Sequence, residues 1–228
     1  MSHFTWIDFI SFIEHELYHV SYSILACFIC LFVAVLARKA IQKKEAFIPE
    51  GKCNIKGFFE LCLEQISSLS EDIIGPGGRR MLPLFCFFFI FIWIQNLIGL
   101  IPGFLPPTQN INTTMALGVF SFLAYNYYGF KEHGWGYLKQ FLGPVLILMP
   151  LFVFIEILSH LFRSVSLGFR LFGNMMGDHV VISIFLDLAP WFIPIIFYFL
   201  GLFVCTLQAF VFTILSMVYV SLAISHDH

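Results

Sequence analysis

Residues 170–179 read RLFGNMMGDH and lie inside an apolar stretch that extends from about 144 to 187. If this stretch forms a single helix, a rise of about 1.5 Å per residue makes it roughly 65 Å long, whereas the hydrocarbon core of a bilayer is about 30 Å thick. No proline occurs between Pro150 and Pro190 to break the helix. A tilt of roughly 60° would fit it into the membrane, far more than the usual tilt of about 20°. We therefore expect one long, strongly tilted helix here.

A second apolar stretch, about 191–224, follows after the short segment 187–190. Two such helices in succession predict a tilted hairpin embedded in the membrane. The composition agrees with this prediction, because 59% of the 228 residues are hydrophobic, 30 are Phe and only 11% are charged. A chain of this composition cannot bury its apolar surface in one soluble core. The predicted fold class is an all-α polytopic membrane protein with about five membrane-embedded helices and one amphipathic surface helix.

The rest of the chain is expected to belong to the same membrane domain, 1–228. Between residues 55 and 74, apolar side chains alternate with Glu and Asp at roughly helical period, which is typical of an amphipathic helix at the membrane surface or against the bundle. The predicted parts are, in order, 1–37 (N-terminus and first membrane helix, about 18–37), 38–80 (basic segment with the amphipathic helix, ended by the glycines of 75–78), 81–130 (two membrane helices, about 81–100 and 114–130) and 144–224 (the tilted hairpin).

Lysine and arginine are concentrated in one segment of the chain. Of twelve such residues, eight fall between positions 38 and 80 and none precedes them: Arg38, Lys39, Lys43, Lys44, Lys52, Lys56, Arg79 and Arg80. By the positive-inside rule this segment is cytoplasmic, or on the equivalent side of an organelle membrane. Counting membrane crossings from it predicts an N-terminus outside and a C-terminus in the cytoplasm. The N-terminus lacks the basic region of a signal peptide, so we expect the first apolar span to be a true membrane helix.

Three charged residues of the long helix follow one another at intervals of seven: Glu156, Arg163 and Arg170. Seven residues are nearly two helical turns, so the three share one face. His179 lies about 180° from Arg170 around the helix, and Asp178 about 80°. An arginine in mid-membrane costs about 2.5–3.5 kcal/mol on insertion scales, and such residues are usually functional. A structural ion pair between Glu156 and Arg163, with Arg170 reaching to the membrane interface, is the alternative interpretation.

Small residues accompany Arg170 along the same helix. Gly173 and Gly177 lie close to it, and Gly168 is one position off their line. Such a surface allows close contact between helices in a membrane. We therefore expect another helix to pack closely against this part of the chain.

Four motifs stand in order over about 80–224, namely Asn96-Leu-Ile-Gly-Leu-Ile-Pro102, Asn112-Thr-Thr114, Ser166-Leu-Gly-Phe-Arg-Leu-Phe-Gly-Asn174 and Thr206-Leu-Gln-Ala-Phe-Val-Phe212. Together they resemble subunit a of the rotary ATP synthases, the membrane stator half of a proton channel. The third motif is highly specific to that family. The N-terminal third of the chain resembles the family only in its predicted topology.

The resemblance implies that Arg170 is the family's essential arginine, facing a rotating ring of small hairpin subunits that each carry one carboxyl group at mid-membrane. It implies that His179 lines one aqueous half-channel and Glu156 the other, and that Asn174 and Gln208 occupy polar positions near the arginine. Together with the ionisable residues of the long helix, the candidate proton-translocation residues are Arg170, His179, Asp178, Asn174, Gln208, Glu156, Arg163 and His160.

The resemblance also implies the setting in which the chain works. It would be a non-catalytic subunit without metal or cofactor, in the plasma (inner) membrane of a bacterium. Its partners would be the ring of small hairpin subunits, the membrane subunit of the peripheral stalk, the rest of the ATP synthase and the lipid bilayer, with no nucleic acid.

The sequence departs from the family pattern at three positions. Relatives often have His or Glu where this chain has Gly201, paired with the position of His179. We expect Asp178 to replace that partner, because it lies on the same helical turn as His179. Ser164 stands where a proline is common, and Asn110 where some relatives have Asp. These departures concern the lining of the outer half-channel rather than the arginine.

Two alternatives belong to other functional classes. Residues 15–19 read HELYH, the HExxH pattern of metalloproteases, in which His15 and His19 could bind zinc while Glu16 acts as base. The motif lies at the outer end of the first predicted helix without an evident third ligand, which argues against an intramembrane zinc protease. A substrate transporter is disfavoured because the sequence shows no internal repeats.

Overall fold

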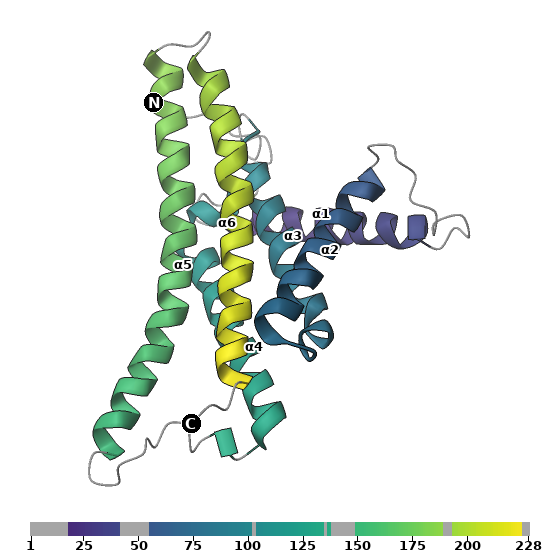
Figure 1. The fold of residues 1–228 in the computed structure, drawn as a ribbon. Coiled ribbons are helices and arrows are strands. Elements are labelled where there is room, and N and C mark those ends of the chain that lie inside the picture. Colours follow the sequence, from purple (N-terminus) through teal and green to yellow (C-terminus); the bar gives the residue numbers. More distant parts are fainter. Residues whose placement is uncertain are drawn as a thin grey trace.

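The computed structural model describes residues 18–41, 55–101, 104–134, 136–137, 149–188 and 193–224. Within these ranges every regular element is helical (Figure 1). The elements are α1 (Tyr18–Ile41), α2 (Ile55–Ile74), η3 (Gly78–Arg80), α3 (Leu82–Ile98), η4 (Pro107–Gln109), α4 (Ile111–His133), α5 (Met149–Leu188) and α6 (Ile193–Ile224), where η denotes a short 3-10 helix. The predicted all-α fold class is confirmed.

The two long C-terminal helices form the predicted hairpin. Helix α5 is continuous over 40 residues and α6 over 32 residues, and Figure 1 shows them side by side along most of their length. Both are long and apolar enough to cross a membrane, over Leu151–Leu186 and Ile195–Ile224. The prediction of an unbroken α5 is confirmed, while its tilt in a membrane stays a prediction.

Contacts between distant residues define how the other helices pack on this hairpin. Phe88 of α3 packs on Phe212 of α6 with ring centroids 5.4 Å apart, and Asn96 of α3 lies next to Cys205 of α6, so α3 and α6 are antiparallel. Helix α4 runs parallel to α6, with the hydroxyls of Ser121 and Ser216 2.9 Å apart. The four helices α3 to α6 therefore form one bundle around a shared apolar core.

Large apolar side chains cover much of the outer surface of the long helices. Phe154 is 64% exposed, Ile196 69% and Phe199 76%. By contrast, Phe85 and Leu171 point into the bundle and are fully buried. An apolar exterior around an apolar core is stable in the hydrocarbon core of a bilayer and unfavourable in water.

Helix α2 packs against the bundle, one of the two positions that its amphipathic pattern allowed. Its face is anchored to α6 by a hydrogen bond from Ser221 Oγ to the carbonyl of Ile73, 2.8 Å long. It ends before Gly75, whose φ of +86° is a left-handed conformation that favours glycine. The prediction that the glycine-rich segment ends this helix is confirmed.

Helix α1 is longer than the expected first span, and its orientation was not predicted from the sequence. It continues to Ile41, past the pair Arg38 and Lys39, because both residue types are good helix formers whose charge alone does not end a helix. It also runs crosswise to α5 and α6 in Figure 1, packing against α3 through Tyr22.

Candidate functional site

Arg170 lies on the outer face of α5. The bundle-facing stripe of this helix contains Leu167, Leu171 and Met175, which are 1%, 0% and 3% exposed. Arg170 precedes Leu171 by one residue, about 100° around the helix, and its side chain is exposed. Among the described residues it forms no hydrogen bond or salt bridge. Its charge is therefore available to a group from outside the chain.

One turn further along α5, a polar contact joins the two long helices. Asn174 donates a hydrogen bond from Nδ2 to Oε1 of Gln208 on α6. Gln208 is 4% exposed, and its Nε2 has no acceptor within the described part of the chain. The structure thus brings these two predicted site residues together. The Nε2 donor of Gln208 stays without an acceptor among the described residues.

Asp178 fills the space left by a glycine of α6. Gly201 is buried, and a Cβ atom at this position would lie 2.8 Å from Oδ2 of Asp178 and 2.9 Å from a methyl carbon of Leu100. His179, the next residue, is half-buried. The carboxylate from α5 therefore stands where a side chain from α6 would otherwise be.

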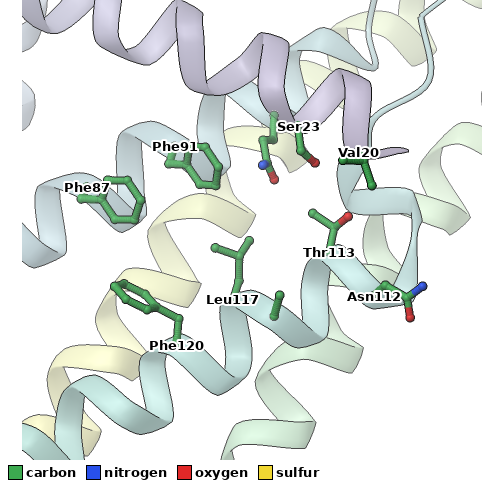
Figure 2. Close-up of a pocket in the computed structure, with 10 residues that line it drawn as sticks. Val20, Ser23, Phe87, Phe91, Asn112, Thr113, Leu117 and Phe120 are labelled. Atoms are coloured by element: carbon green, nitrogen blue, oxygen red, sulfur yellow. The ribbon is translucent and has the colours of Figure 1, made fainter. Parts of the chain in front are cut away.

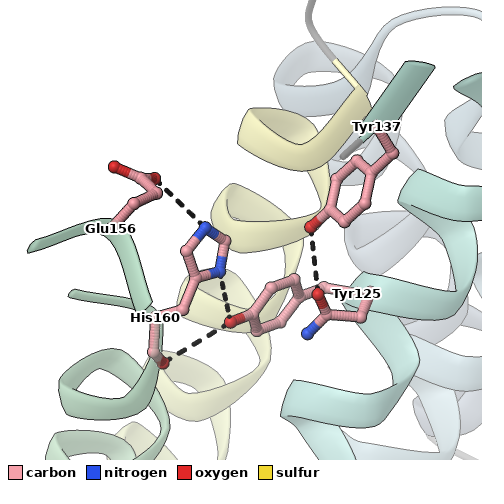
Figure 3. Close-up of polar contacts among 5 residues, drawn as sticks. Tyr125, Tyr137, Glu156 and His160 are labelled. Carbon is pink, nitrogen blue, oxygen red and sulfur yellow. Dashed lines mark hydrogen bonds and ion pairs between the residues drawn. The ribbon is translucent and has the colours of Figure 1, made fainter. Parts of the chain in front are cut away.

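A second polar cluster lies near the start of α5 (Figure 3). Nε2 of His160 is 3.2 Å from Oε1 of Glu156, one turn earlier on the same helix. The Tyr125 hydroxyl of α4 is 2.8 Å from Nδ1 of His160. His160 is 5% exposed and Tyr125 1%. Only Glu156, whose side chain is 33% exposed, reaches the surface.

The predicted alternative of a Glu156–Arg163 ion pair does not form, because Glu156 instead contacts His160. Arg163 is half-buried and makes no salt bridge with any residue that the structure describes. Tyr125 was not predicted from the sequence. Nothing distinguishes it there from the other tyrosines, and only the packing of α4 on α5 identifies it.

Arg170 lies between the two polar clusters along α5. At about 1.5 Å per residue, it is roughly 15 Å from His160 on one side and roughly 12 Å from Asp178 on the other. The structure does not bring the predicted residues into one site. It places them in two groups that are separated by the arginine.

The glycines of α5 differ in their surroundings. A Cβ atom at Gly168 would lie 3.0 Å from the Thr114 carbonyl oxygen of α4, whereas at Gly173 and Gly177 nothing lies within 4 Å. The predicted close packing therefore occurs within the chain at Gly168, and the other two glycines face open space among the described residues.

Two of the departures from the family pattern have structural roles. Asn110 is the N-cap of α4, with its side-chain oxygen accepting a hydrogen bond from Asn112 N at 2.9 Å. Ser164 is buried where α5 approaches α4, because a Cβ atom at Gly118 would lie 2.7 Å from the Ser164 carbonyl oxygen. Serine at this position keeps the α5 hydrogen bonds that a proline would break.

A pocket of about 450 Å³ opens between α1, α3 and α4, away from both clusters (Figure 2). Its lining is mostly apolar, including Phe87, Leu117 and Phe120, and none of the predicted site residues contributes to it. Gln95, which also lines it, is fully buried, and neither of its amide atoms has a partner in the described ranges.

The structure offers no support for the zinc hypothesis. His15 and Glu16 lie outside the described residues, as does the side chain of His19. Within the ranges that the structure describes, no group of three His, Cys, Asp or Glu side chains could hold a metal ion.

Comparisons with known proteins point to one family. The family model described as "ATP synthase A chain" matches residues 20–221. The ATP synthase subunit a of Bdellovibrio bacteriovorus is 48% identical over 227 residues, 99% of each chain. That of Trichlorobacter lovleyi is 38% identical over 98% of this chain and 97% of its own, and that of Geobacter sulfurreducens is 41% identical over 92% and 88%.

The similarity extends further than the four motifs predicted. It includes the N-terminal third, because the family match begins at residue 20 rather than near residue 80. The N-terminal helices are thus part of the family's fold and not an unrelated addition. The chain belongs to the ATP synthase A chain family, the non-catalytic, proton-translocating membrane subunits of the ATP synthase.

Proposed function

We propose that this chain conducts protons to and from the carboxyl groups of a rotating ring through two separate aqueous half-channels, with Arg170 between them. As a family member it is a multi-pass membrane subunit of a bacterial ATP synthase and has no catalytic site of its own. The proposal concerns which residues carry the protons and how rotation is coupled to them.

The observation that carries the proposal is the position of Arg170. It is exposed on the face of α5 that turns away from the bundle, without an ion-pair partner among the described residues, and a polar cluster lies on each side of it. A guanidinium that is buried or already ion-paired could not form an ion pair with a passing ring carboxylate, whereas the exposed guanidinium of Arg170 can.

The physical coupling follows from two opposing effects on a ring carboxyl group. In contact with lipid, burial raises its pKa and keeps it neutral. At about 4 Å from a guanidinium, an effective dielectric constant of 20 gives roughly 4 kcal/mol of attraction, which favours the ionised form by a similar amount. A carboxyl group therefore releases its proton as it approaches Arg170 and must regain one before it returns to lipid.

Arginine suits this role better than lysine. Its guanidinium stays protonated at any accessible pH, whereas a buried lysine can lose its proton. A fixed positive charge also repels protons, so Arg170 blocks direct leakage between the half-channels. Each proton that crosses 100 mV of membrane potential then contributes about 2.3 kcal/mol to rotation.

We assign the cluster at the α5–α6 contact to the outer half-channel. Asp178 and His179 would exchange protons there, with Asp178 occupying the space over Gly201. The free Nε2 donor of Gln208 would bind an approaching ring carboxylate, since Oε1 is already engaged by Asn174. Glu156, His160 and Arg163, near the start of α5, would form the inner half-channel.

The orientation and partners follow from this assignment. The N-terminus would lie outside and the C-terminus in the cytoplasm of a bacterial inner membrane, with residues 1–228 forming one membrane domain. The ring would pack against α5 at Gly173 and Gly177, where no described residue fills the space. The crosswise course of α1 supports a strong tilt of the hairpin. If α1 spans the membrane along its normal, then α5 and α6, which run crosswise to it, are strongly inclined to the normal. The peripheral stalk and lipid would cover the remaining helices.

Arg170→Ala tests the proposal. We expect it to abolish ATP-driven acidification of inverted membrane vesicles while the enzyme still assembles, because the ring carboxyl groups lose the charge that ionises them. Fluorescence quenching of a pH-sensitive dye measures the acidification. Arg79→Ala is a matched control, since Arg79 is an exposed arginine of η3 far along the chain from the site. Normal proton pumping by the Arg170→Ala enzyme would contradict the proposal.

A further inference from the structure

Tyr125 has no part in the function proposed so far, yet its hydroxyl touches a predicted proton carrier. The hydroxyl oxygen lies 2.8 Å from Nδ1 of His160 and 3.5 Å from the His160 carbonyl oxygen. The phenol ring packs edge-on against Phe122, with centroids 5.4 Å apart, and is 1% exposed. Figure 3 shows the hydroxyl directed at the imidazole from the opposite helix.

This arrangement satisfies His160 in both of its protonation states. In the neutral imidazole, Nε2–H donates to Glu156 at 3.2 Å and Nδ1 accepts from the Tyr125 hydroxyl. In the protonated imidazole, both nitrogens donate. The Tyr125 hydroxyl then accepts from Nδ1–H and turns its own hydrogen toward the His160 carbonyl oxygen. The hydroxyl needs only to rotate, so a buried histidine can change charge without leaving a polar atom unpaired.

We propose that Tyr125 positions His160 as a proton relay behind Glu156, so that Tyr125, His160 and Glu156 work as one unit at the inner end of the proton path. The inference rests on the proposed function of the inner half-channel. Glu156 is the surface member, which exchanges protons with water, and His160 is the buried member, which carries them inward. Tyr125 does not transfer the proton itself but orients the imidazole that does.

The other charged and titratable groups around the imidazole come from three elements. Arg163 and Glu156 lie on α5 itself, Tyr219 of α6 packs edge-on against Tyr125 with ring centroids 6.2 Å apart, and Tyr137 follows α4. The Tyr137 hydroxyl donates a hydrogen bond to Asn126 Oδ1 at 3.0 Å. Tyr125 is thus the neighbouring tyrosine whose hydroxyl holds the imidazole.

The test measures how ATP-driven proton uptake depends on pH in inverted vesicles that contain the whole enzyme. The cytoplasmic side faces the buffer there, so the buffer pH acts directly on the inner half-channel. Initial pumping rates are divided by the uncoupled ATP hydrolysis rate at each pH, which removes the pH dependence of ATP hydrolysis itself. Assembly is verified from the amount of intact complex in the membrane.

Tyr125→Phe keeps the ring and removes only the hydroxyl. We expect the pH at which pumping falls to half to move about 0.5 to 1 unit lower, because a lost hydrogen bond penalises the charged imidazolium more than the neutral ring. Tyr137→Phe is the matched control, since Tyr137 is equally buried and its hydroxyl bonds Asn126. Its pH profile should equal that of the unchanged protein, and an equal shift in both variants would overturn the proposal.

The double variant shows whether the effect acts through the histidine. His160→Gln should remove this titration step from the profile, and Tyr125→Phe added to it should cause no further shift. A shift of the same size in both backgrounds, or a His160→Gln profile like that of the unchanged protein, would contradict the relay. If Tyr125→Phe fails to assemble, the His160→Gln profile alone decides.

The fate of the broader proposal is read separately in the same vesicles. Arg170→Ala without pumping, together with an unshifted Tyr125→Phe profile, would overturn only the relay. Pumping by Arg170→Ala would instead overturn the proposed function on which the relay rests.

Discussion

The two polar clusters of α5 differ in how completely the chain satisfies them. At the inner cluster, Glu156, His160 and Tyr125 contact one another in a continuous series, and only the Glu156 carboxylate is partly exposed. At the outer cluster, Gln208 keeps a buried donor without a partner in the described ranges, and Asp178 lies over a glycine. The inner cluster is therefore self-contained, whereas the outer one leaves hydrogen-bonding capacity for a group from outside the chain.

This difference has a physical meaning in a membrane. An unpaired buried donor costs about 1–3 kcal/mol, so an acceptor from outside the chain would stabilise the outer cluster by pairing with Gln208. The hydrogen-bonded series of Glu156, His160 and Tyr125 needs no acceptor from outside the chain, and it can keep its geometry while protons are transferred. We infer that the outer cluster meets the ring directly and that the inner cluster conducts protons from a distance.

Among changes within the two clusters, the largest expected effect comes from removing both titratable groups of the outer cluster. Asp178→Asn combined with His179→Ala should slow proton entry about tenfold or more, because general acid–base groups typically contribute factors of 10² or above. The loss of His160 alone should slow it far less. Proton-driven ATP synthesis in vesicles with an imposed pH gradient measures both. Equal effects would contradict the assignment of the outer half-channel to Asp178 and His179.

An intermediate effect is expected from one added methyl group. Gly201→Ala places a Cβ atom 2.8 Å from Oδ2 of Asp178 and 2.9 Å from Leu100, so the carboxylate must move and proton pumping should fall several-fold. Both close atoms are the ends of flexible side chains, so they can shift, and the main effect falls on the position of the Asp178 carboxylate.

Gly77→Ala is the control for that experiment, because nothing lies within 4 Å of its added atom in the described structure and its φ of −76° suits any residue. It adds the same methyl group away from Asp178 and from the proposed ring contact, so pumping should be unchanged. Unchanged pumping by Gly201→Ala would show that the place of Asp178 over the glycine is unimportant.

The smallest expected effect concerns stability alone. Tyr125→Phe removes one buried hydrogen bond from the self-contained cluster and should destabilise the isolated chain in detergent by about 1 kcal/mol. Thermal unfolding monitored by tryptophan fluorescence measures this. Tyr137→Phe should cost a similar amount, so the two variants match in stability while differing in their pH profiles. A much larger loss for Tyr125→Phe would mean that the inner cluster is chiefly a structural support.

Much of the helical architecture could be predicted from local sequence. The apolar stretch without an internal proline predicted the uninterrupted α5, and the alternation of Phe, Leu and Glu predicted α2. The positions of helix ends were less predictable. Helix α1 passes Arg38 and Lys39, since charged residues with high helix propensity end an apolar span but not a helix.

The candidate site was predictable only in part. Arg170 could be recognised because an arginine inside an apolar run is costly and the motif around it is specific. The Glu156–Arg163 pair was a reasonable expectation from spacing, but at i and i+7 the side chains are two turns apart, and His160 at i+4 is the nearer neighbour. No sequence pattern marked Tyr125 as a site residue, because its contact with His160 depends on the packing of α4 against α5, a helix that is distant in sequence.

The amino-acid sequence by itself determined the order of the main helices, their membrane character and the presence of a charged arginine at position 170 in an apolar run, since these depend on local composition and on the energy of placing each residue in lipid. Tertiary structure decided which polar groups meet. Whether Asp178 reaches Gly201, or Tyr125 reaches His160, depends on the register and closeness of two packed helices. That register results from the summed fit of many side chains along both helices, and no short stretch of sequence contains it.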